Sequence, residues 1–394
     1  MNILLVTGVF PPRSYGGVTA TSYAIAKKLA ERGNKVTVFT TDVGNNQYSR
    51  LNVPRVGYLN GINVHYFKNL NNMLAFKHRV LTPVEMPIAL IRQVREVDVI
   101  HLNGFRNFHD AAVGYFAKKF DVPYLQQSHG DLPRIMTKRR LKQLSEELYG
   151  YRILQNASRV IALNQLEAER YMMLGIPKEK VAIIPNGIDL SEYSRLPLKG
   201  LFKHKYGIPE NKKVILYLSR IDKIKGVDFL VQAYAHLMKT MLYTDAILVI
   251  AGPDEGFLSE VNLLAKSLGV SKSILFTGAI YGEEKLQAYV DSDVYVLPSR
   301  YETFPMGLLE AYACCKPVIT SNVGGLKDLV IDGNTGFLIN EGEIKLFAEK
   351  LHFLLNNNDD AKAMGLHGND FVCKNYSIDR IVSKLEHVYE EMMK

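Results

Sequence analysis

Short apolar runs alternate with segments of helical periodicity along the whole chain. The first run covers residues 3–7 and the second 36–40, and between them apolar residues recur at helical spacing over 19–30. Buried strands that alternate with helices are typical of a parallel sheet covered on both faces. In the first half the pattern predicts strands at 3–7, 36–40, 62–67, 97–101, 124–127, 159–162 and 181–184.

The second half repeats this alternation and ends in three predicted helices. Because 394 residues exceed what one ordinary core holds, two domains are expected, with a hinge within 189–201. The predicted fold class is α/β, with two doubly wound domains that face a cleft and bind ligands at the carboxyl ends of their strands. The strands predicted here are 214–218, 247–251, 274–277, 294–297, 317–320 and 336–339.

The composition is that of a globular protein without a membrane span or a disulfide framework. Apolar residues make up 47% of the chain and charged residues 22%, and no apolar run approaches the ~18 residues of a membrane span. The first strand follows the N-terminus without the basic region and cleavage site of a signal peptide. Three cysteines, two of them adjacent, fit a reducing cytosol, so we expect a cytoplasmic location.

The net charge of +8 is unevenly distributed. Residues 1–195 carry 26 Lys and Arg against 15 Asp and Glu, a net +11, whereas the remainder carries a net −3. A basic first half favours an anionic partner, such as a membrane surface or a phosphate-bearing acceptor. A basic surface that is merely solvated is the alternative.

The segment 299–325 combines features of an anion-binding pocket. It follows the predicted strand 294–297, and Pro305 stands where a helix can begin. Glu302 then lies in the loop before that helix and Glu310 on the helix itself. The free N–H groups and the dipole at a helix N-terminus favour an anion such as a phosphate. The segment therefore predicts a nucleotide-sugar pocket.

These residues carry a resemblance to a known family. Glu302 and Glu310 match the E-x7-E motif of retaining glycosyltransferase family four, with Leu-Pro-Ser before it and Lys-Pro-Val-Ile and Gly-Gly after it. The resemblance covers nearly the whole chain. It implies a GT-B fold with Rossmann-like domains at 1–195 and 196–377, the first on the acceptor side and the second binding the donor. The final helix, 378–394, would cross back to the first domain.

Two cations match the family's binding site for the donor diphosphate. Arg220 ends the strand 214–218, and Lys225 stands directly before Gly226. By resemblance both hold the diphosphate and act catalytically, because placed cations stabilise the charge that grows on a leaving group. Lys223 is a rival for the second cation, and solvated surface charges are the alternative.

The acidic motif and its neighbours are expected to bind the rest of the donor. By resemblance Glu310 accepts hydrogen bonds from the ribose, while Glu302, a catalytic residue, and Thr303 and Phe304 contact the sugar or phosphate. Family members commonly have Gly-Phe-Gly after the first glutamate, whereas this chain has Thr-Phe-Pro. The loop that contains Ile280 falls where the family binds the base.

In the first half, two loops match the family's active site. Gly16 and Gly17 follow the first strand without a G-x-G-x-x-G pattern, and by resemblance they contact the donor phosphate and the acceptor. A tight turn is the alternative. His129 follows the strand 124–127 and matches the family's active-site histidine, which lines the donor sugar. Asp131 contributes to the same site or caps its loop.

Three other patterns are interpreted as structural. Asp291 and Asp293 form a D-x-D, but they precede a strand and are expected to end a helix rather than hold a metal. Cys314 and Cys315 are expected to pack, and the segment 185–189 to form a turn at the domain boundary. Neither a metal nor a cofactor is therefore expected.

The resemblance implies metal-independent transfer of a sugar, with retention, from a UDP- or GDP-sugar to an acceptor hydroxyl. The acceptor would be a glycan or a lipid-linked sugar in polysaccharide or glycolipid biosynthesis, and no nucleic acid partner is expected. A nucleotide-sugar epimerase and a silent nucleotide-sugar-binding protein remain alternatives. A basic amphipathic segment is predicted to dock on anionic lipid or to form a solvated helix face. Its cations are Arg134, Lys138, Arg139, Arg140 and Lys142.

Overall fold

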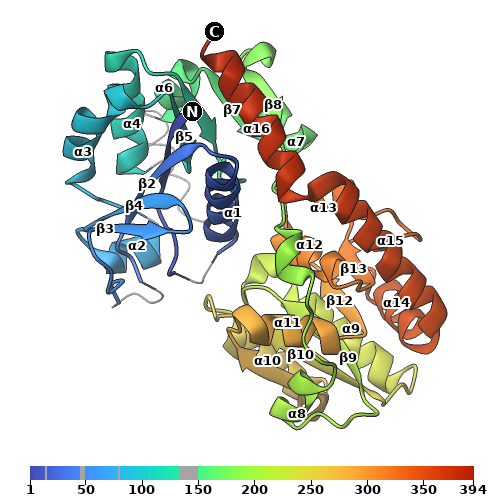
Figure 1. The fold of residues 1–394 in the computed structure, drawn as a ribbon. Helices are drawn as coiled ribbons and strands as arrows, with labels where there is room; N and C mark the ends of the chain where they lie inside the picture. Colours follow the sequence, from blue (N-terminus) through green and yellow to red (C-terminus); the bar gives the residue numbers. More distant parts are fainter. Residues whose placement is uncertain (14–15, 45–48, 79, 106, 133–149) are drawn as a thin grey trace. The chain divides into compact units, whose positions relative to one another are not determined.

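The computed structural model describes all residues except 14–15, 45–48, 79, 106 and 133–149 (Figure 1). The basic segment around Lys138 therefore lies outside the described residues. The chain forms two compact units, each with a sheet covered by helices: Met1–Gly187 together with Ile378–Lys394, and Ile188–Ser377. Among the described residues, no helix combines the length and the apolar character needed to cross a membrane.

The first unit contains an eight-stranded sheet with the order β3-β4-β2-β1-β5-β6-β7-β8. All neighbouring pairs are parallel except the β3–β4 hairpin at one edge. The sequence pattern did not predict β3, although the turn Asn60-Gly61, with both φ angles positive, is a hairpin signal. The strands are β1 Asn2–Thr7, β2 Lys35–Thr41, β3 Val56–Leu59, β4 Ile62–Phe67, β5 Val99–Asn103, β6 Tyr124–Gln127, β7 Arg159–Ala162 and β8 Val181–Ile183.

Alternate residues of the central strand enter separate cores on the two faces of this sheet. Leu4 and Val6 of β1 belong to one cluster, and Ile3 and Leu5 belong to the other. This is the doubly wound arrangement that the strand and helix alternation predicts. The helices are α1 Gly17–Glu31, α2 Asn72–His78, α3 Met86–Gln93, η1 Val94–Glu96, α4 Phe108–Phe120, α6 Tyr151–Asn156, α7 Gln165–Met173, η3 Lys178–Lys180 and α16 Ile378–Met392.

The C-terminal helix α16 is an integral part of the first unit, as the resemblance implies. Ile381 and Leu385 are buried in the core beside α1, and Arg32, which directly follows α1, donates a hydrogen bond to Glu386 over 2.8 Å. At the end of α16 the buried Tyr389 hydroxyl lies 2.6 Å from Nδ1 of His101 on β5. A helix remote in sequence thus completes one face of the sheet.

The boundary between the units lies at Gly187, eight residues before the expected position after residue 195. Ile188 pairs with Ser377, and its N–H donates to the carbonyl of Tyr376 over 2.9 Å. Tyr193, in the short helix η4 Leu190–Tyr193, is buried in the core of the second unit. The expected linker therefore belongs to the second unit, because its apolar side chains are buried there.

The buried His101 makes the stability of the first unit depend on pH. Burial lowers the pKa of this imidazole to about 4, although a hydrogen bond with Gln127 raises it, from an ordinary value of 6.5. Between pH 4 and pH 6.5 the His101 imidazole is protonated in the unfolded chain but neutral in the folded one. The stabilisation is therefore complete above pH 6.5 and is lost as the pH falls towards 4.

We expect His101→Gln to reduce the pH dependence of unfolding. The wild-type free energy of unfolding should fall by up to about 3 kcal/mol more than that of the variant between neutral pH and about pH 4.5. Urea titrations at several pH values, followed by circular dichroism, measure the difference. Parallel curves for the two proteins would contradict the burial of a neutral imidazole.

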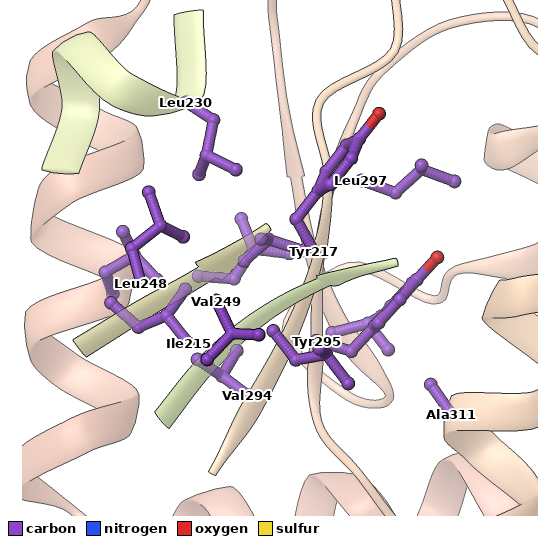
Figure 2. Packing of buried hydrophobic residues seen from close by; sticks show 14 of the residues in the cluster. Ile215, Tyr217, Leu230, Leu248, Val249, Val294, Tyr295, Leu297 and Ala311 are labelled. Atoms are coloured by element: carbon purple, nitrogen blue, oxygen red, sulfur yellow. The ribbon is translucent and has the colours of Figure 1, made fainter. Parts of the chain in front are cut away.

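The second unit contains a six-stranded, fully parallel sheet with the order β11-β10-β9-β12-β13-β14. Figure 2 shows its centre, where Tyr217 of β9 and Tyr295 of β12 pack among aliphatic side chains. The chain order reverses between β9 and β12, and ligands bind at such switch points. The strands are β9 Lys213–Leu218, β10 Ala246–Ala251, β11 Ile274–Gly278, β12 Val294–Leu297, β13 Val318–Ser321 and β14 Gly336–Ile339.

Helices of the second unit connect these strands, and two long helices follow the last strand. The alternation predicted from the sequence is present throughout. The helices are η4 Leu190–Tyr193, α8 Leu201–Tyr206, η5 Lys223–Lys225, α9 Val227–Lys239, α10 Leu258–Ser267, η6 Ser271–Ser273, α11 Gly282–Asp291, α12 Met306–Ala313, α13 Leu326–Leu329, α14 Ile344–Asn356 and α15 Asn358–Tyr376.

Candidate active site

The predicted donor residues of the second unit gather around its switch point. Arg220 follows β9, and Glu302 follows β12, the strand hydrogen-bonded beside β9. Because both strands are parallel, their carboxyl ends meet at one edge of the sheet. The fold thus brings together two residues that lie 82 positions apart in the sequence.

Lys225 and Glu302 form a nearly buried ion pair. The Lys225 Nζ donates to Oε1 and Oε2 of Glu302 over 2.8 and 2.6 Å, and the two residues are only 8% and 9% exposed. The rival cation Lys223 is exposed on the same short helix η5. Removing one partner of such a pair leaves an uncompensated buried charge, which typically costs about 3–5 kcal/mol.

The backbone around Lys225 is held in place by contacts that the sequence did not reveal. Arg300 donates to both carboxylate oxygens of Asp228 and, over 2.6 Å, to the carbonyl of Lys223. Gly226 has φ +68°, and a Cβ there would lie 1.9 Å from the carbonyl oxygen of Pro298. Only glycine allows this close approach of the η5 turn to the end of β12.

Glu302 is held by its main chain as well. Its carbonyl accepts a hydrogen bond from the N–H of Gly325 over 3.0 Å. Thr303 lies beside it and donates from Oγ1 to the Tyr301 hydroxyl, while Phe304 packs against the ring of Tyr376. Pro305 directly precedes α12, so the helix begins where the sequence predicts.

Glu310 lies on α12 with both carboxylate oxygens engaged. Lys285 Nζ donates to Oε1 over 2.7 Å, and the Tyr289 hydroxyl donates to Oε2 over 3.0 Å. Burial lowers the pKa of Lys285, but the Glu310 carboxylate outweighs this effect and raises the pKa above its ordinary value. Lys285 therefore stays charged, and burial raises the pKa of Tyr289 so that its hydroxyl stays protonated.

The sequence interpretation did not include Lys285 and Tyr289. They lie four residues apart on one face of α11, the helix that follows the predicted base-binding loop. This spacing is the signal that could have drawn attention to them. Their contacts orient the Glu310 carboxylate and supply it with a compensating charge.

Arg220 and Ile280 follow β9 and β11, two strands that β10 separates in the sheet. Arg220 is ion-paired with Glu255, and its carbonyl accepts a hydrogen bond from the Tyr217 hydroxyl over 2.6 Å. Ile280 follows β11, but its side chain is 5% exposed and belongs to the core of the unit. A contact between the Ile280 loop and a base would therefore have to use the backbone.

In the first unit, the two predicted loops also lie at carboxyl ends of strands. Gly16 caps α1 with φ +108°, and Gly17 is the first residue of that helix. A Cβ on Gly16 would meet only Thr19 Oγ1, at 3.7 Å. Backbone conformation rather than crowding therefore requires glycine at this position.

His129 has a left-handed backbone conformation, with φ +50°, directly after β6. Its Nε2 lies 2.7 Å from Oδ1 of Asn103, and Nδ1 is buried without a hydrogen-bond partner among the described residues. Burial, together with the nearby His101, lowers the pKa of His129 to about 3. The neutral ring thus donates to Asn103 through Nε2 and keeps a free lone pair on Nδ1.

The loop after His129 is fixed by a buried carboxylate. Glu167 accepts hydrogen bonds from the N–H groups of Gly130 and Leu163 over 2.8 and 2.7 Å. Asp131 donates its N–H to the carbonyl of Ser128. Asn103 and Glu167, which the sequence interpretation missed, therefore orient the His129 loop. Non-glycine residues with a left-handed backbone conformation, such as His129, cluster at functional sites.

The D-x-D and cysteine patterns have structural partners. Asp291 ends α11 and accepts hydrogen bonds from the N–H groups of Gly200 and Lys203, while Asp293 pairs with Lys213. Cys314 is buried, and burial raises the pKa of its thiol to about 12. Among the described residues, no three His, Cys, Asp or Glu side chains gather in a group that could hold a metal ion.

Family models match both units. The model of Glycosyltransferase Family 4 matches residues 15–192, and the model of glycosyl transferases group 1 matches residues 199–371. An N-acetyl-alpha-D-glucosaminyl L-malate synthase of Bacillus anthracis is 26% identical over 388 residues, covering 97% of this chain and 95% of that protein. An uncharacterized glycosyltransferase of Methanocaldococcus jannaschii is 28% identical over 339 residues, 84% of this chain and 83% of that protein.

Solved structures agree with the family models on the fold. HepE of Anabaena, solved in complex with UDP and glucose, has a TM-score of 0.78 at 18% identity and covers 99% of this chain and 100% of that chain. A sucrose-phosphate synthase from Thermosynechococcus elongatus has a TM-score of 0.78 at 22% identity, covering 99% and 98%. The chain belongs to glycosyltransferase family 4, with the GT-B fold, and is a glycosyltransferase.

Proposed function

We propose that this glycosyltransferase moves a sugar from a nucleoside-diphosphate sugar to an acceptor hydroxyl and retains the anomeric configuration. The observation that carries the proposal is the nearly buried Lys225–Glu302 pair at the switch point of the second unit. It places a cation and a carboxylate where such sheets bind ligands. The UDP bound to HepE supports a donor of the same chemical class.

Lys225 and Arg220 have the chemistry to bind a diphosphate and stabilise its departure. An ammonium offers three donors, and Glu302 takes two of them from Lys225, so one remains for a phosphate oxygen. Arg220 offers a planar fork of N–H groups that suits phosphate oxygens. As the bond to the sugar breaks, negative charge grows on the diphosphate and both interactions strengthen.

The two glutamates would position the sugar and the ribose. A carboxylate has about four acceptor positions, and Lys285 and Tyr289 use two of those on Glu310. The remaining positions suit the two ribose hydroxyls. Glu302, oriented by Lys225 and assisted by Thr303 and Phe304, would accept from the sugar hydroxyls. In the first unit, His129 Nδ1 provides a further acceptor, and Gly16 and Gly17 leave the backbone open to a phosphate.

We further propose that no metal takes part, because Lys225 and Arg220 supply the positive charge that a metal would otherwise provide. Activity is therefore expected to survive prolonged treatment with EDTA. The test compares turnover before and after chelation, with Mg²⁺ added back in a parallel sample. A complete loss that Mg²⁺ restores would contradict the metal-free mechanism.

The acceptor of the proposed reaction is a glycan or a lipid-linked sugar, in polysaccharide or glycolipid biosynthesis at the cytoplasmic face of a membrane. The basic first half of the chain, with a net charge of +11, supports an anionic acceptor or surface. A UDP- or GDP-sugar is the proposed donor.

One assay tests the proposed function directly. The purified chain is incubated with a panel of UDP- and GDP-sugars, with and without a mixture of glycan and lipid-linked acceptors. We expect thermal stabilisation by one donor. We also expect a product whose new linkage keeps the anomeric configuration of that donor. Release of free sugar and nucleotide without any dependence on acceptor would favour the epimerase alternative. Binding without turnover would favour the silent binding protein.

A further inference from the structure

Large apolar side chains gather on one exposed part of the first unit. Eight of the 22 large apolar side chains that are exposed among the described residues fall between residues 56 and 91, roughly a tenth of the chain. An even distribution of these 22 side chains along the chain would place about two of them there. Single exposed apolar residues are ordinary, whereas groups of them are not. This apolar surface consists of Val56, Tyr58, Leu70, Met73, Leu74, Val84, Ile88 and Ile91.

Hydrogen bonds and an ion pair join the segments that carry this surface. Arg55, beside β3, pairs with Glu85 before α3, with 3.3 Å between Nη1 and Oε2. The N–H of Leu70 donates to the carbonyl of Thr82, also over 3.3 Å. The exposed side chains therefore belong to adjoining segments.

Helix α3 shows the chemistry of the surface most clearly. Its inner side buries Met86 and Leu90 in the core of the unit. Its outer side carries Ile88 and Ile91, which are 55% and 48% exposed, next to the exposed Arg92. A helix face that combines aliphatic side chains with arginine is typical of segments that lie on a membrane surface.

The charge around this apolar surface distinguishes between two possible binding partners, a second copy of the chain and a lipid bilayer. Residues 55–98 contain six Lys or Arg and three acidic residues, Glu85, Glu96 and Asp98, a net charge of +3. The exposed cations Arg55, Lys68 and Arg92 belong to this set. A symmetric dimer through this surface would place the same positive charge on both sides, which is repulsive. An anionic bilayer has the opposite charge and also accepts apolar side chains at its interface.

We propose that the first unit docks on an anionic lipid bilayer through this apolar surface and its surrounding cations. The isoleucines, leucines and methionine enter the headgroup boundary, and the cations lie on the lipid phosphates. The inference deepens the proposed function, because a lipid-linked acceptor resides in such a bilayer. Its test needs no glycosyl transfer and can fail independently of that function.

Sedimentation with vesicles provides the first test. The wild-type protein should bind vesicles of phosphatidylglycerol mixed with phosphatidylcholine at low salt, and binding should fall steeply by ~0.3 M salt. Ile88→Ser with Ile91→Ser, and separately Lys68→Glu with Arg92→Glu, should each lower vesicle affinity more than about tenfold. The matched control, Met173→Ser with Lys178→Glu, changes exposed residues of the same unit and should bind as the wild type does.

The absence of tryptophan from the chain allows a second, site-specific test. Ile91→Trp places the only indole on the proposed surface, whereas Met173→Trp places it on the exposed side of α7. The fluorescence of the first variant should shift to shorter wavelength on anionic vesicles and be quenched by brominated lipid. The second variant should show neither change.

The remaining outcomes overturn the proposal. These are failure of the wild type to bind anionic vesicles at low salt, equal binding to neutral vesicles, or surface variants that bind as tightly as the wild type. Self-association of the wild type without lipid, abolished by the isoleucine changes, would assign the surface to a second copy instead. Donor binding measured on the same samples shows whether the proposed function stands when the docking fails.

Discussion

Lys225→Met is expected to lower turnover by about 10²–10³-fold while changing the KM for the donor far less. The Lys225 ammonium lies in a nearly buried position, where its interaction with a leaving diphosphate strengthens as charge develops. Methionine preserves most of the side-chain volume and removes the charge. Steady-state kinetics with the donor identified by the panel measures kcat and KM separately, and an effect on KM alone would show that Lys225 only binds the ground state.

Two further variants separate catalysis from folding. Because Lys225→Met leaves the Glu302 carboxylate nearly buried and unpaired, the thermal midpoint should fall, and adding Glu302→Gln should restore much of it without restoring turnover. Lys223→Met, two residues away and exposed, is the matched control and should remain close to wild type. Arg220→Ala is expected to follow Lys225→Met in lowering kcat. Full activity of the Lys225 variant, with loss in the Lys223 variant, would reverse the assignment of the two lysines.

Glu310→Gln is expected to weaken binding of the nucleoside diphosphate by at least about tenfold. Hydrogen bonds from ribose hydroxyls to a charged acceptor each contribute roughly 1.5–3 kcal/mol, and an amide replaces one acceptor oxygen by a donor. The effect should disappear with a 2′,3′-dideoxy ligand, which lacks both hydroxyls. Calorimetry with the two ligands measures this difference. Equal loss of affinity for both ligands would show that Glu310 does not bind the ribose.

Lys285→Met tests whether the ion pair with Lys285 helps Glu310 to bind the ribose. Without the ammonium, the Glu310 carboxylate loses its compensating charge and one of its two hydrogen bonds, so preference for the ribose ligand should decrease. The double variant with Glu310→Gln should then lose little more, because the two residues act through one carboxylate. Glu283→Gln, on the exposed side of the same helix, is the matched control. Strict additivity of the two changes would contradict the coupling.

The predicted strands of both units are present because most of them are short apolar runs buried on both faces of a parallel sheet. Val36 and Val38 of β2, for example, lie in one core and Phe39 in the other. The hairpin strand β3 was missed because its exposed Val56 and Tyr58 lie at a sheet edge, where burial does not constrain the pattern. The unit boundary was misplaced because the burial of Tyr193 depends on packing against distant segments.

In the second unit, the sequence placed Arg220, Lys225, Glu302 and Glu310 at the ends of predicted strands or on the following helix. This was possible because loops after parallel strands meet at one edge of the sheet, whatever the details of packing. Their partners could not be predicted. Lys285, Tyr289 and Arg300 are ordinary helix and loop residues until the fold brings them against Glu310 and η5.

By itself the sequence determined the α/β architecture, the strands of two parallel sheets and the family, because apolar periodicity and ordered motifs are local properties. Only the tertiary structure decided that Lys225 rather than Lys223 is buried, and that it pairs with Glu302, 77 residues away. It also decided that α16 completes the first unit and that Ile280 turns its side chain into the core. Burial and long-range pairing are set by how elements pack, and no local pattern contains that information.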